Sequence, residues 1–353
     1  MRIAQVAPLH ESVPPKLYGG TERVVSWLTE ELVREGHAVT LFASGDSTTR
    51  ARLVPITPRS LRLDKRVRKE MPHLMVELER VIQMASEFDL IHWHVDYWSF
   101  PLIRRLTTPS VVTLHGRLDL QDLSPLYREY RDMPVVSISN AQREPIPWAN
   151  WQGTVYHGMP RDLFAFRAQP GSYLAFLGRI SPEKGLPQAI EIARRTGMPL
   201  KIAAKIDKED KEYYEEQIKP LLNSPLVNFV GEISQREKNE FLGNAYAVLF
   251  PIQWREPFGL VMIESMACGT PVIAFPGGSV GEIMEDGKTG FVVKGVDEAV
   301  SGFARISEVN RRGCRRVFEK RFTATRMAHD YMAIYDKVIE NKQAALELAK
   351  TLA

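Results

Sequence analysis

The stretch Glu256-Pro-Phe-Gly-Leu-Val-Met-Ile-Glu264 holds two carboxylates with seven residues between them. An apolar run typical of a helix begins at Leu260, and proline and glycine just before it are typical of a helix start. We therefore expect Glu256 in the loop before the helix and Glu264 about two turns into it. The backbone N–H groups of Phe258, Gly259 and Leu260 then form a helix N-terminus, which suits a diphosphate.

Two interpretations of the glutamate pair are open. In the first, Glu256 helps to cap the helix and Glu264 is solvated or salt-bridged. In the second, Glu264 accepts hydrogen bonds from a ribose diol and Glu256 reaches hydroxyls of a group attached to the diphosphate. The flanks favour the second, because residues 247–252 and 269–275 are apolar runs typical of buried strands. A strand–loop–helix–strand unit with acidic groups in its loop is where α/β sheets bind ligands.

Composition indicates an ordinary globular protein. The chain has 353 residues, 44% of them hydrophobic and 25% charged, which is enough for two domains with full cores. A net charge of only +3 argues against broad capture of nucleic acid. Cys268 and Cys314 lie far apart, and Cys268 falls at an apolar helix end, so a buried reduced thiol is expected there in place of a disulfide. No apolar run reaches the length of a spanning helix, and we expect a cytoplasmic protein.

Strands and helices alternate through both halves of the chain, which predicts parallel sheets. Expected strands of the first half lie at 3–7, 38–43, 90–94, 110–115 and 134–139, with a short one within 148–158. Those of the second half lie at 173–178, 200–204, 227–230, 247–250, 271–274 and 290–293. The pattern predicts two doubly wound α/β halves, joined near 161–172 and followed by a helical tail from 325.

Basic residues follow the first strands of the second half. Arg179 and Lys184 lie within Gly178-Arg-Ile-Ser-Pro-Glu-Lys-Gly185, and Lys205 ends the next strand. Arginine offers a planar fork and lysine a point charge, so the three side chains can converge on phosphate oxygens. The alternative is that they are solvated cations beside a helix start.

Two glycines open the first helix of the first half. Gly19 and Gly20 follow the first strand, where glycine lets the backbone approach a ligand and the helix N-terminus favours negative charge. The motif is not GxGxxG, and a simple tight turn is the alternative.

Histidines end two strands of the first half. His115 ends one of them, where a neutral imidazole can donate to a hydroxyl or polarise a departing oxygen; it can equally cap its own strand. The string His92-Trp-His94-Val-Asp96 resembles part of a metal-ligand set but has Tyr97 where a further histidine belongs, so no metal site is expected. His94 and Trp98 instead become candidates for acceptor contacts, with core aromatics as the alternative.

A basic run lies between the second and third expected strands. Its members are Arg62, Lys65, Arg66, Arg68 and Lys69. A solvated helix face is the ordinary interpretation, and a weak contact with an anionic membrane surface is the other.

With these residues in view, the chain resembles a family 4 glycosyltransferase of the GT-B fold. Glu256 and Glu264 match the E-x7-E signature of that family. The Arg179–Lys184 element matches its phosphate-binding element, Tyr18-Gly19-Gly20 its N-terminal glycine loop, and His115 its crevice histidine. Val230-Gly231 fits as well. The likeness spans roughly residues 1–340 and is most specific in 175–293.

The resemblance implies two Rossmann-like domains facing a central cleft. Residues 1–165 would bind the acceptor, 166–324 the nucleotide-sugar donor, and 325–353 would form a helix crossing back to the first domain. It further implies a retaining hexosyltransferase that uses a nucleoside-diphosphate sugar, without metal or other cofactor, by a front-face mechanism.

The resemblance also implies roles for single residues. Arg179 and Lys184 would neutralise the diphosphate, Glu264 would hold the ribose, and Glu256 the sugar hydroxyls. His115 would contact the sugar or stabilise the transition state, and Gly20 would lie against the phosphates or the acceptor.

Two positions depart from the family pattern. His157-Gly158 stands where Asn-Gly is usual, and Ala203-Ala204-Lys205 stands where glycines are usual. They bear on the ribose and base contacts more than on the diphosphate site. Other GT-B chemistry, as in a phosphorylase or a sugar-nucleotide epimerase, and a non-catalytic sugar-nucleotide binder are the alternatives. Whether the donor is a UDP- or GDP-sugar, which acceptor is used and how the chain assembles are left open.

Overall fold

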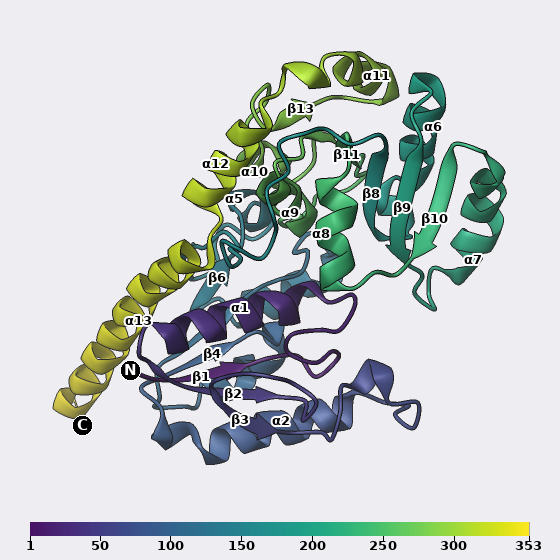
Figure 1. Cartoon of the computed structure of the whole chain (residues 1–353). Coiled ribbons are helices and arrows are strands. Elements are labelled where there is room, and N and C mark those ends of the chain that lie inside the picture. The colour runs from purple at the N-terminus through teal and green to yellow at the C-terminus, as the bar shows by residue number, and fades with distance from the viewer. Residues whose placement is uncertain (353) are drawn as a thin grey trace. The chain divides into compact units, whose positions relative to one another are not determined.

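The computed structural model describes residues 1–352, and the chain divides into two compact units (Figure 1). The first unit is formed by Met1–Pro160 together with the C-terminal helix from Ala324, and the second by Arg161–Thr323. Each unit has one sheet of its own, and every strand pairing found in residues 1–352 is parallel.

The first unit holds a sheet of seven strands in the order β3-β2-β1-β4-β5-β6-β7 over the residues described. The strands are β1 (Arg2–Val6), β2 (Ala38–Ala43), β3 (Arg52–Pro55), β4 (Leu90–Trp93), β5 (Ser110–Thr113), β6 (Val135–Ser137) and β7 (Trp151–Thr154). The helices are α1 (Gly20–Arg34), α2 (Met71–Gln83), α3 (Phe100–Ile103), α4 (Ser124–Glu129), α5 (Asn140–Arg143) and α13 (Ala324–Leu352). Short turns of 3₁₀ helix lie at Leu61–Leu63, Ala85–Glu87, Asp96–Ser99 and Gln121–Leu123. The chain order reverses between β1 and β4, so the ends of these two strands flank a topological switch point.

The central strands of this sheet are buried along their whole length, because helices cover both of its faces. All four residues of β4 are buried, as are all four of β5, which is typical of parallel strands under helices. Helices α1 and α2 lie on opposite sides of the sheet (Figure 1). Trp93 and Phe100 are fully buried in the core beneath α2.

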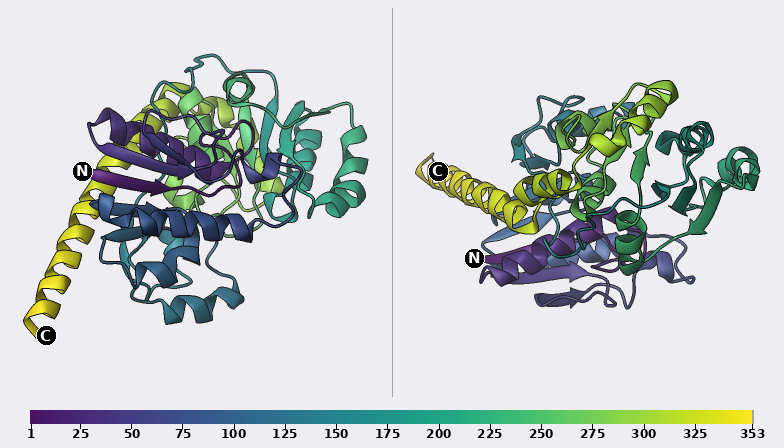
Figure 2. Two further views of the ribbon diagram at one scale, coloured as in Figure 1. Left: turned by 90° about the horizontal axis from the view of Figure 1, so that it is seen from below. Right: turned by 45° about the horizontal axis from the view of Figure 1, so that its top comes forward.

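The long C-terminal helix α13 belongs to this first unit and packs beside α1 (Figure 2). Its inward side chains Met327, Tyr331 and Tyr335 are fully buried, whereas Leu348 near its end is 62% exposed. The earlier turns of the helix therefore complete the core, and the last turns run past it.

The second unit holds a sheet of six strands in the order β10-β9-β8-β11-β12-β13 within the described chain. The strands are β8 (Leu174–Arg179), β9 (Leu200–Lys205), β10 (Val227–Gly231), β11 (Ala247–Phe250), β12 (Val272–Ala274) and β13 (Gly290–Val292). The helices are α6 (Leu186–Thr196), α7 (Lys211–Tyr213), α8 (Gln235–Gly243), α9 (Leu260–Cys268), α10 (Val280–Ile283), α11 (Val296–Ala304) and α12 (Arg311–Arg321). Turns of 3₁₀ helix lie at Pro182–Lys184, Lys219–Asn223 and Ile306–Glu308, and a π-helical turn lies at Tyr214–Ile218. Here the switch point lies between β8 and β11.

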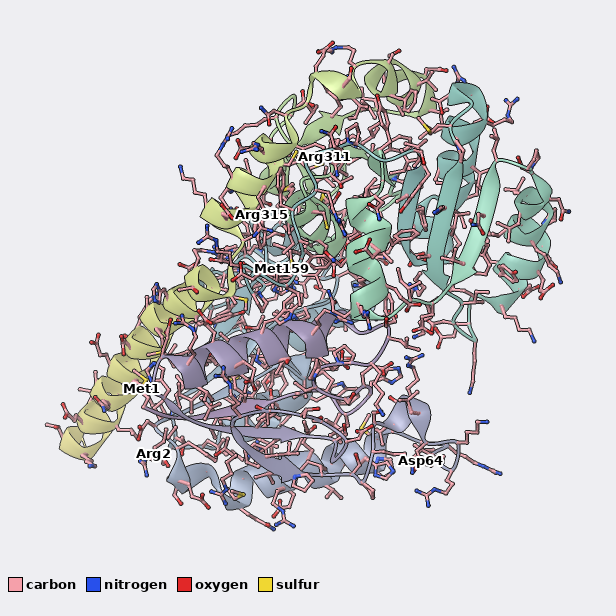
Figure 3. The ribbon with its side chains drawn as sticks, in the orientation of Figure 1. Met1, Arg2, Asp64, Met159, Arg311 and Arg315 are labelled. Atoms are coloured by element: carbon pink, nitrogen blue, oxygen red, sulfur yellow. The ribbon has the colours of Figure 1, made fainter. Side chains whose placement is uncertain are left out.

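Two arginines of α12, labelled in Figure 3, bind the carbonyl groups at the ends of other elements of the second unit. Arg311 donates to the carbonyls of Gly243 and Ala245 at 3.0 and 3.2 Å, just where α8 ends. Arg315 donates to the carbonyl of Ala267 in the last turn of α9 at 2.7 Å. Because the last carbonyls of a helix have no partner within it, these guanidinium groups satisfy them and hold α8 and α9 in place.

The α/β class with two Rossmann-like units is confirmed, and most expected strands lie within a residue or two of the observed ones. β3 was missed: Arg52–Pro55 is short, begins with arginine, ends with proline and pairs only with β2 at the sheet edge. The interpretation of the basic run as a helix face was wrong. Beyond the turn Leu61–Leu63 its residues lie outside any helix, and α2 begins only at Met71.

Candidate active site

In the second unit, the expected phosphate-binding element and the glutamate loop lie at the switch point. β8 ends at Arg179, and a 3₁₀ turn, Pro182–Lys184, follows it. The neighbouring strand β11 ends at Phe250, and residues 251–259 then lead into α9. Because parallel strands present their carboxyl ends at one edge of a sheet, the sequence folds both loops to the same edge.

The two loops are tied together through their backbones. The amide of Gln253 donates to the carbonyl of Glu183 at 2.8 Å. Gly185 has φ +71°, and a Cβ placed there would lie 1.9 Å from the carbonyl oxygen of Pro251. Only glycine permits so close an approach in this conformation. The approach sets Lys184 directly against the loop that carries Glu256.

Lys184 and Glu256 form an ion pair, with Nζ 2.6 Å from Oε2. The indole Nε1 of Trp254 donates to the same oxygen at 3.0 Å, and Nζ of Lys184 lies 4.6 Å from the centre of the Trp254 ring. Glu256 is only 8% exposed. The expected residues are therefore brought together, and Trp254, which sequence reasoning did not single out, donates to the same carboxylate oxygen as Lys184.

The backbone before α9 is supported by the loop after β12. The amide of Ser279 donates to the carbonyl of Glu256 and its hydroxyl to that of Phe258, both at 2.9 Å. Gly278 has φ +53°, and a Cβ there would lie 2.2 Å from the Glu256 carbonyl oxygen. α9 begins at Leu260 behind Gly259, as expected. The first N–H groups of such a helix have no carbonyl partner within it, so its partly exposed start can bind an anion.

Glu264 lies inside α9 and is 1% exposed. Its Oε1 forms an ion pair of 2.8 Å with Nζ of Lys238 on α8. The first interpretation from the sequence was that Glu264 is either solvated or salt-bridged. The structure shows the salt bridge, and the side chain is not solvated. Lys238 was not predicted from the sequence, because nothing in a surface helix marks the single lysine that reaches a distant carboxylate.

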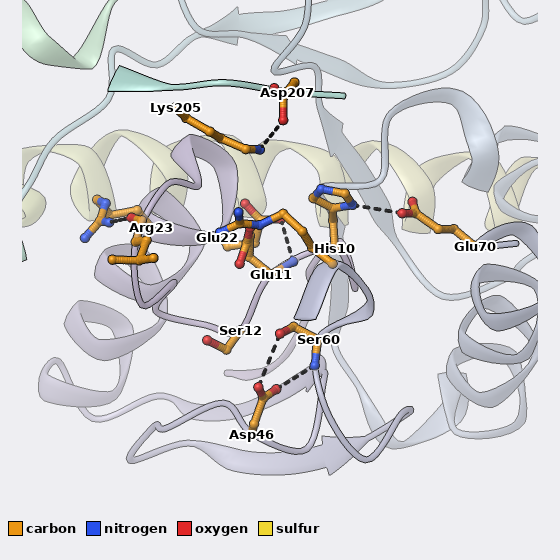
Figure 4. A network of polar contacts seen from close by, with 12 residues as sticks. His10, Glu11, Ser12, Glu22, Arg23, Asp46, Ser60, Glu70, Lys205 and Asp207 are labelled. Carbon is orange, nitrogen blue, oxygen red and sulfur yellow. Dashed lines mark hydrogen bonds and ion pairs between the residues drawn. The ribbon is translucent and has the colours of Figure 1, made fainter. Parts of the chain in front are cut away.

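Arg179 and Lys205 are neighbours across β8 and β9, where they are paired in register. Nζ of Lys205 lies 2.7 Å from Oδ1 of Asp207, a contact seen in Figure 4, and the Arg179 guanidinium lies 3.8 Å from Oδ2 of the same carboxylate. Arg179 also pairs with Glu183 and Asp210. Burial raises the pKa of Asp210, although Arg179 opposes this. Arg179 and Lys184 are thus held by different carboxylates rather than on one shared partner.

Gly231 ends β10 with φ +80°, and a Cβ there would meet no atom within 4 Å. The position demands glycine for its backbone conformation and leaves open space beside it. Its strand, β10, is separated from β8 by β9 in the sheet.

In the first unit, the loop from β1 to α1 is held by buried acids. The amide of Glu11 donates to Glu22 at 3.3 Å, a contact drawn in Figure 4, and Arg62 forms an ion pair with the Glu11 carboxylate. Arg62 is therefore half-buried, because its guanidinium group reaches the buried Glu11 carboxylate. Gly19 has φ +149°, with its Cβ position 2.8 Å from Cβ of Pro15, and α1 begins at Gly20.

The histidines at the strand ends of the first unit form a contiguous group. His94 is 1% exposed, with Nε2 2.8 Å from Oε1 of Gln5 and Nδ1 2.9 Å from Nε2 of His115. The His115 ring stacks on that of His157, with centres 5.4 Å apart and planes 18° apart. His94 was expected as an acceptor contact, but in this structure its side chain is buried and both ring nitrogens are hydrogen-bonded, to Gln5 and to His115.

Burial keeps these imidazoles neutral. It lowers the pKa of His115 to about 3 and the pKa values of His94 and His157 well below their ordinary range. Trp98, the other acceptor candidate, is 41% exposed on the turn after β4. Over residues 1–352, no group of His, Cys, Asp and Glu side chains is arranged to hold a metal ion.

Two family models match the chain, one in each half. Residues 165–312 match the model described as glycosyl transferases group 1, and residues 18–143 match that described as glycosyltransferase family 4. Among curated relatives, the O-antigen chain mannosyltransferase C of Escherichia coli is 24% identical over 96% of this chain and 100% of its own length. A D-inositol 3-phosphate glycosyltransferase of Kribbella flavida is 25% identical over 82% of each chain.

Solved structures agree in fold. The sucrose-phosphate synthase of Thermosynechococcus elongatus superposes with a TM-score of 0.79 at 18% identity, over 96% of this chain and 99% of that one. HepE of Anabaena, solved in complex with UDP and glucose, gives 0.72 at 18% identity over 96% and 100%. The fold, the glutamate loop and the family matches agree: this protein is a glycosyltransferase of the GT-B fold. Within that class, the two family matches and the GT-B neighbours together support a glycosyltransferase of the family 4 type. None of the helices described combines the length and apolar character needed to cross a bilayer.

Proposed function

We propose that this glycosyltransferase moves a hexosyl group from a nucleoside-diphosphate sugar to an acceptor hydroxyl, with retention and without a metal ion. The observation that carries the proposal is the Lys184–Glu256 pair beside the start of α9, at the switch point of the second sheet. A cation, a carboxylate and free helix amides at one place suit a diphosphate joined to a sugar. The Anabaena neighbour, which has been solved in complexes with UDP and with UDP-glucose, supports this class of donor.

Lys184 can serve Glu256 and a phosphate at once. Its ammonium group has three protons, one of which is used in the contact with Glu256. We assign the remaining protons, with the guanidinium of Arg179 and the ammonium of Lys205, to the diphosphate oxygens. Charge that develops on the departing diphosphate is then stabilised by groups already in place, which is commonly the largest catalytic contribution.

The remaining roles follow from position. Glu256 would hold hydroxyls of the donor sugar, and Glu264 the ribose through the oxygen that does not face Lys238. Gly231 leaves room for the nucleoside. The backbone at Gly19 and Gly20 would approach the phosphates or the acceptor, and His115 would contact the sugar.

Retention is proposed to occur by front-face transfer. The one carboxylate assigned to the sugar, Glu256, already accepts from Lys184 and Trp254, which suits a binding role better than that of a covalent nucleophile. The bond from the anomeric carbon to the diphosphate breaks, the acceptor oxygen attacks on the same face, and its proton passes to the departing phosphate oxygen.

The acceptor is proposed to bind to the first unit, with Trp98 as an aromatic contact. A weak contact of Lys65, Arg66, Arg68 and Lys69 with anionic lipid, and a cytoplasmic location, are further predictions. A phosphorylase, which would consume a sugar 1-phosphate, is the competing activity.

The experiment combines binding with transfer. A thermal-shift screen against nucleoside diphosphates and sugar nucleotides identifies the base, because a ligand at a hundred times its Kd adds about 2.7 kcal/mol. The donor found is then used with candidate acceptors, and NMR of the product gives its anomeric configuration. Arg179→Ala should lower turnover at least about 100-fold, whereas Arg194→Ala, which removes an exposed ion pair with Glu191, should not. Inversion, loss of activity with chelator, or near-native turnover of Arg179→Ala would each contradict part of the proposal.

A further inference from the structure

A continuous chain of hydrogen bonds, buried except for its half-buried last link, runs through the first unit from helix α13 to His115. Two of its members are tyrosines of α13 that lie one turn apart. The other members are side chains of the strands β1, β4 and β5 and of the residues that follow β4 and β5. The links, in order, are Tyr331 OH to Thr113 Oγ1 at 2.9 Å, Thr113 Oγ1 to His92 Nε2 at 2.7 Å, His92 Nδ1 to Tyr335 OH at 2.7 Å, Tyr335 OH to Gln5 Nε2 at 3.1 Å, Gln5 Oε1 to His94 Nε2 at 2.8 Å, and His94 Nδ1 to His115 Nε2 at 2.9 Å.

Gln5 gives this chain a direction. Its amide Nε2 donates to Tyr335, so Oε1, which can only accept, is the atom that faces His94. His94 Nε2 must then carry the ring proton. A neutral imidazole has one such proton, so His94 Nδ1 is an acceptor and His115 Nε2 must donate to it.

Because its ring proton is on Nε2, His115 has a lone pair at Nδ1. This nitrogen is buried and has no hydrogen-bond partner within the part of the chain that the structure describes. The rest of the residue is fixed: its amide donates to Asp96 at 3.2 Å, and its ring lies against His157. A buried acceptor without a donor is unfavourable, so the position is suited to a ligand that brings an O–H or N–H group.

We propose that Gln5 and His94 are positioning residues that hold His115 in the Nε2–H tautomer, so that Nδ1 accepts a hydrogen bond from a substrate hydroxyl. This rests on the proposed function, in which His115 contacts the sugar. It replaces the donor role expected from the sequence, because the only ring proton of His115 is already given to His94.

The tautomer is measured first, in the ligand-free full chain labelled with ¹⁵N at its eight histidines, with the His115 signals assigned from a His115→Gln variant. We expect a protonated Nε2 and a bare Nδ1 in His115, unchanged between about pH 5.5 and 8. A protonated Nδ1, which the opposite orientation of the Gln5 amide would produce, overturns the proposal. So does a His115 that titrates in this range.

Two tyrosine variants form a matched pair. Tyr335→Phe removes the hydroxyl that orients the Gln5 amide, and Tyr331→Phe removes an equally buried hydroxyl at the far end of the chain. Tyr335→Phe should mix the two tautomers of His115, and Tyr331→Phe should leave the Nε2–H form. The same spectrum for both variants, mixed or unmixed, overturns the proposal.

Gln5→Leu then tests the effect on the reaction. We expect kcat to fall at least about tenfold with the KM for the donor changed by less than about twofold, since the hydrogen bond is needed most as the sugar departs. Tyr331→Phe should stay within about threefold of the wild-type kcat. Equal losses in both variants, or a wild-type kcat in Gln5→Leu, overturn the positioning role. Because the tautomer is read without substrate, a chain that transfers no sugar contradicts the proposed function and leaves the tautomer result standing.

Discussion

Lys184 and Glu256 lie 72 positions apart in the chain and meet at 2.6 Å in the second unit, each largely buried. The loop after β8 and the loop after β11 can bring them together only because Gly185 lets the backbone pass against Pro251. The pair therefore depends on the sheet edge that carries both loops as much as on the two side chains.

The first prediction concerns the stability of this pair. Lys184→Met leaves the buried Glu256 carboxylate with Trp254 but without its cation, and should destabilise the second unit by about 2–4 kcal/mol. Adding Glu256→Gln removes the uncompensated charge and should restore part of the loss. Urea unfolding of the two single variants and the double variant gives the coupling free energy. Strictly additive losses would show that the two groups do not interact.

The second prediction concerns Glu264. Glu264→Gln keeps the shape of the side chain but removes the charge that faces Lys238, and should weaken nucleoside-diphosphate binding about tenfold, or about 1.4 kcal/mol. Calorimetric titration with the nucleotide found in the screen measures it. Glu191→Gln, an exposed carboxylate on α6, is the control and should bind as the wild type does. Unchanged affinity in Glu264→Gln would remove the ribose role.

The third prediction compares two glycines at the ends of α6. Gly185 and Gly197 have similar φ values, +71° and +66°, but a Cβ on Gly197 would meet nothing within 4 Å. Gly197→Ala should cost about 1 kcal/mol for its backbone conformation alone. Gly185→Ala adds a clash with the Pro251 carbonyl, so it should cost more than about 3 kcal/mol and disturb the Lys184–Glu256 pair. Equal thermal stabilities of the two variants would show that the approach to Pro251 is not a constraint.

The fourth prediction is a loss of stability of the first unit in mild acid. Burial lowers the pKa values of His92, His94 and His157, and it lowers the pKa of His115 to about 3. The contribution of each histidine to folding stability is therefore fully present above about pH 6.5, the ordinary pKa of histidine in the unfolded chain. That stability is lost as the pH falls from there toward 3, by up to about 1.4 kcal/mol per pH unit for each histidine.

Urea unfolding at pH 7.5 and pH 5, followed by tryptophan fluorescence, measures this loss. Five of the six tryptophans lie in the first unit. His115→Gln should lower the number of protons taken up on unfolding in acid by up to about one, which reduces the slope of the unfolding free energy with pH. The same substitution at His329, whose side chain is 66% exposed, is the control. A midpoint that does not change with pH would contradict the buried, neutral state of the histidines.

Much of the candidate site was predictable because its signals are local. The start of α9 at Leu260 follows from a proline and a glycine ahead of an apolar run, and Arg179 was placed at a strand end by the apolar residues before it. β3 was missed because Arg52–Pro55 has neither alternation nor an apolar run, and pairing with β2 alone makes it a strand.

The partners of the site residues were not predictable. Trp254 and Lys238 carry no pattern that links them to Glu256 and Glu264, and the tyrosines that lead to His115 lie more than two hundred positions away from Thr113 and His92. Hydrophobic periodicity and turn residues by themselves determined the two parallel sheets, the ends of their strands and the kinds of side chain at those ends. Only the tertiary structure decided which charges pair, which carboxylate is buried and which nitrogen of His115 is left to accept, since those depend on distances between segments that the chain order does not encode.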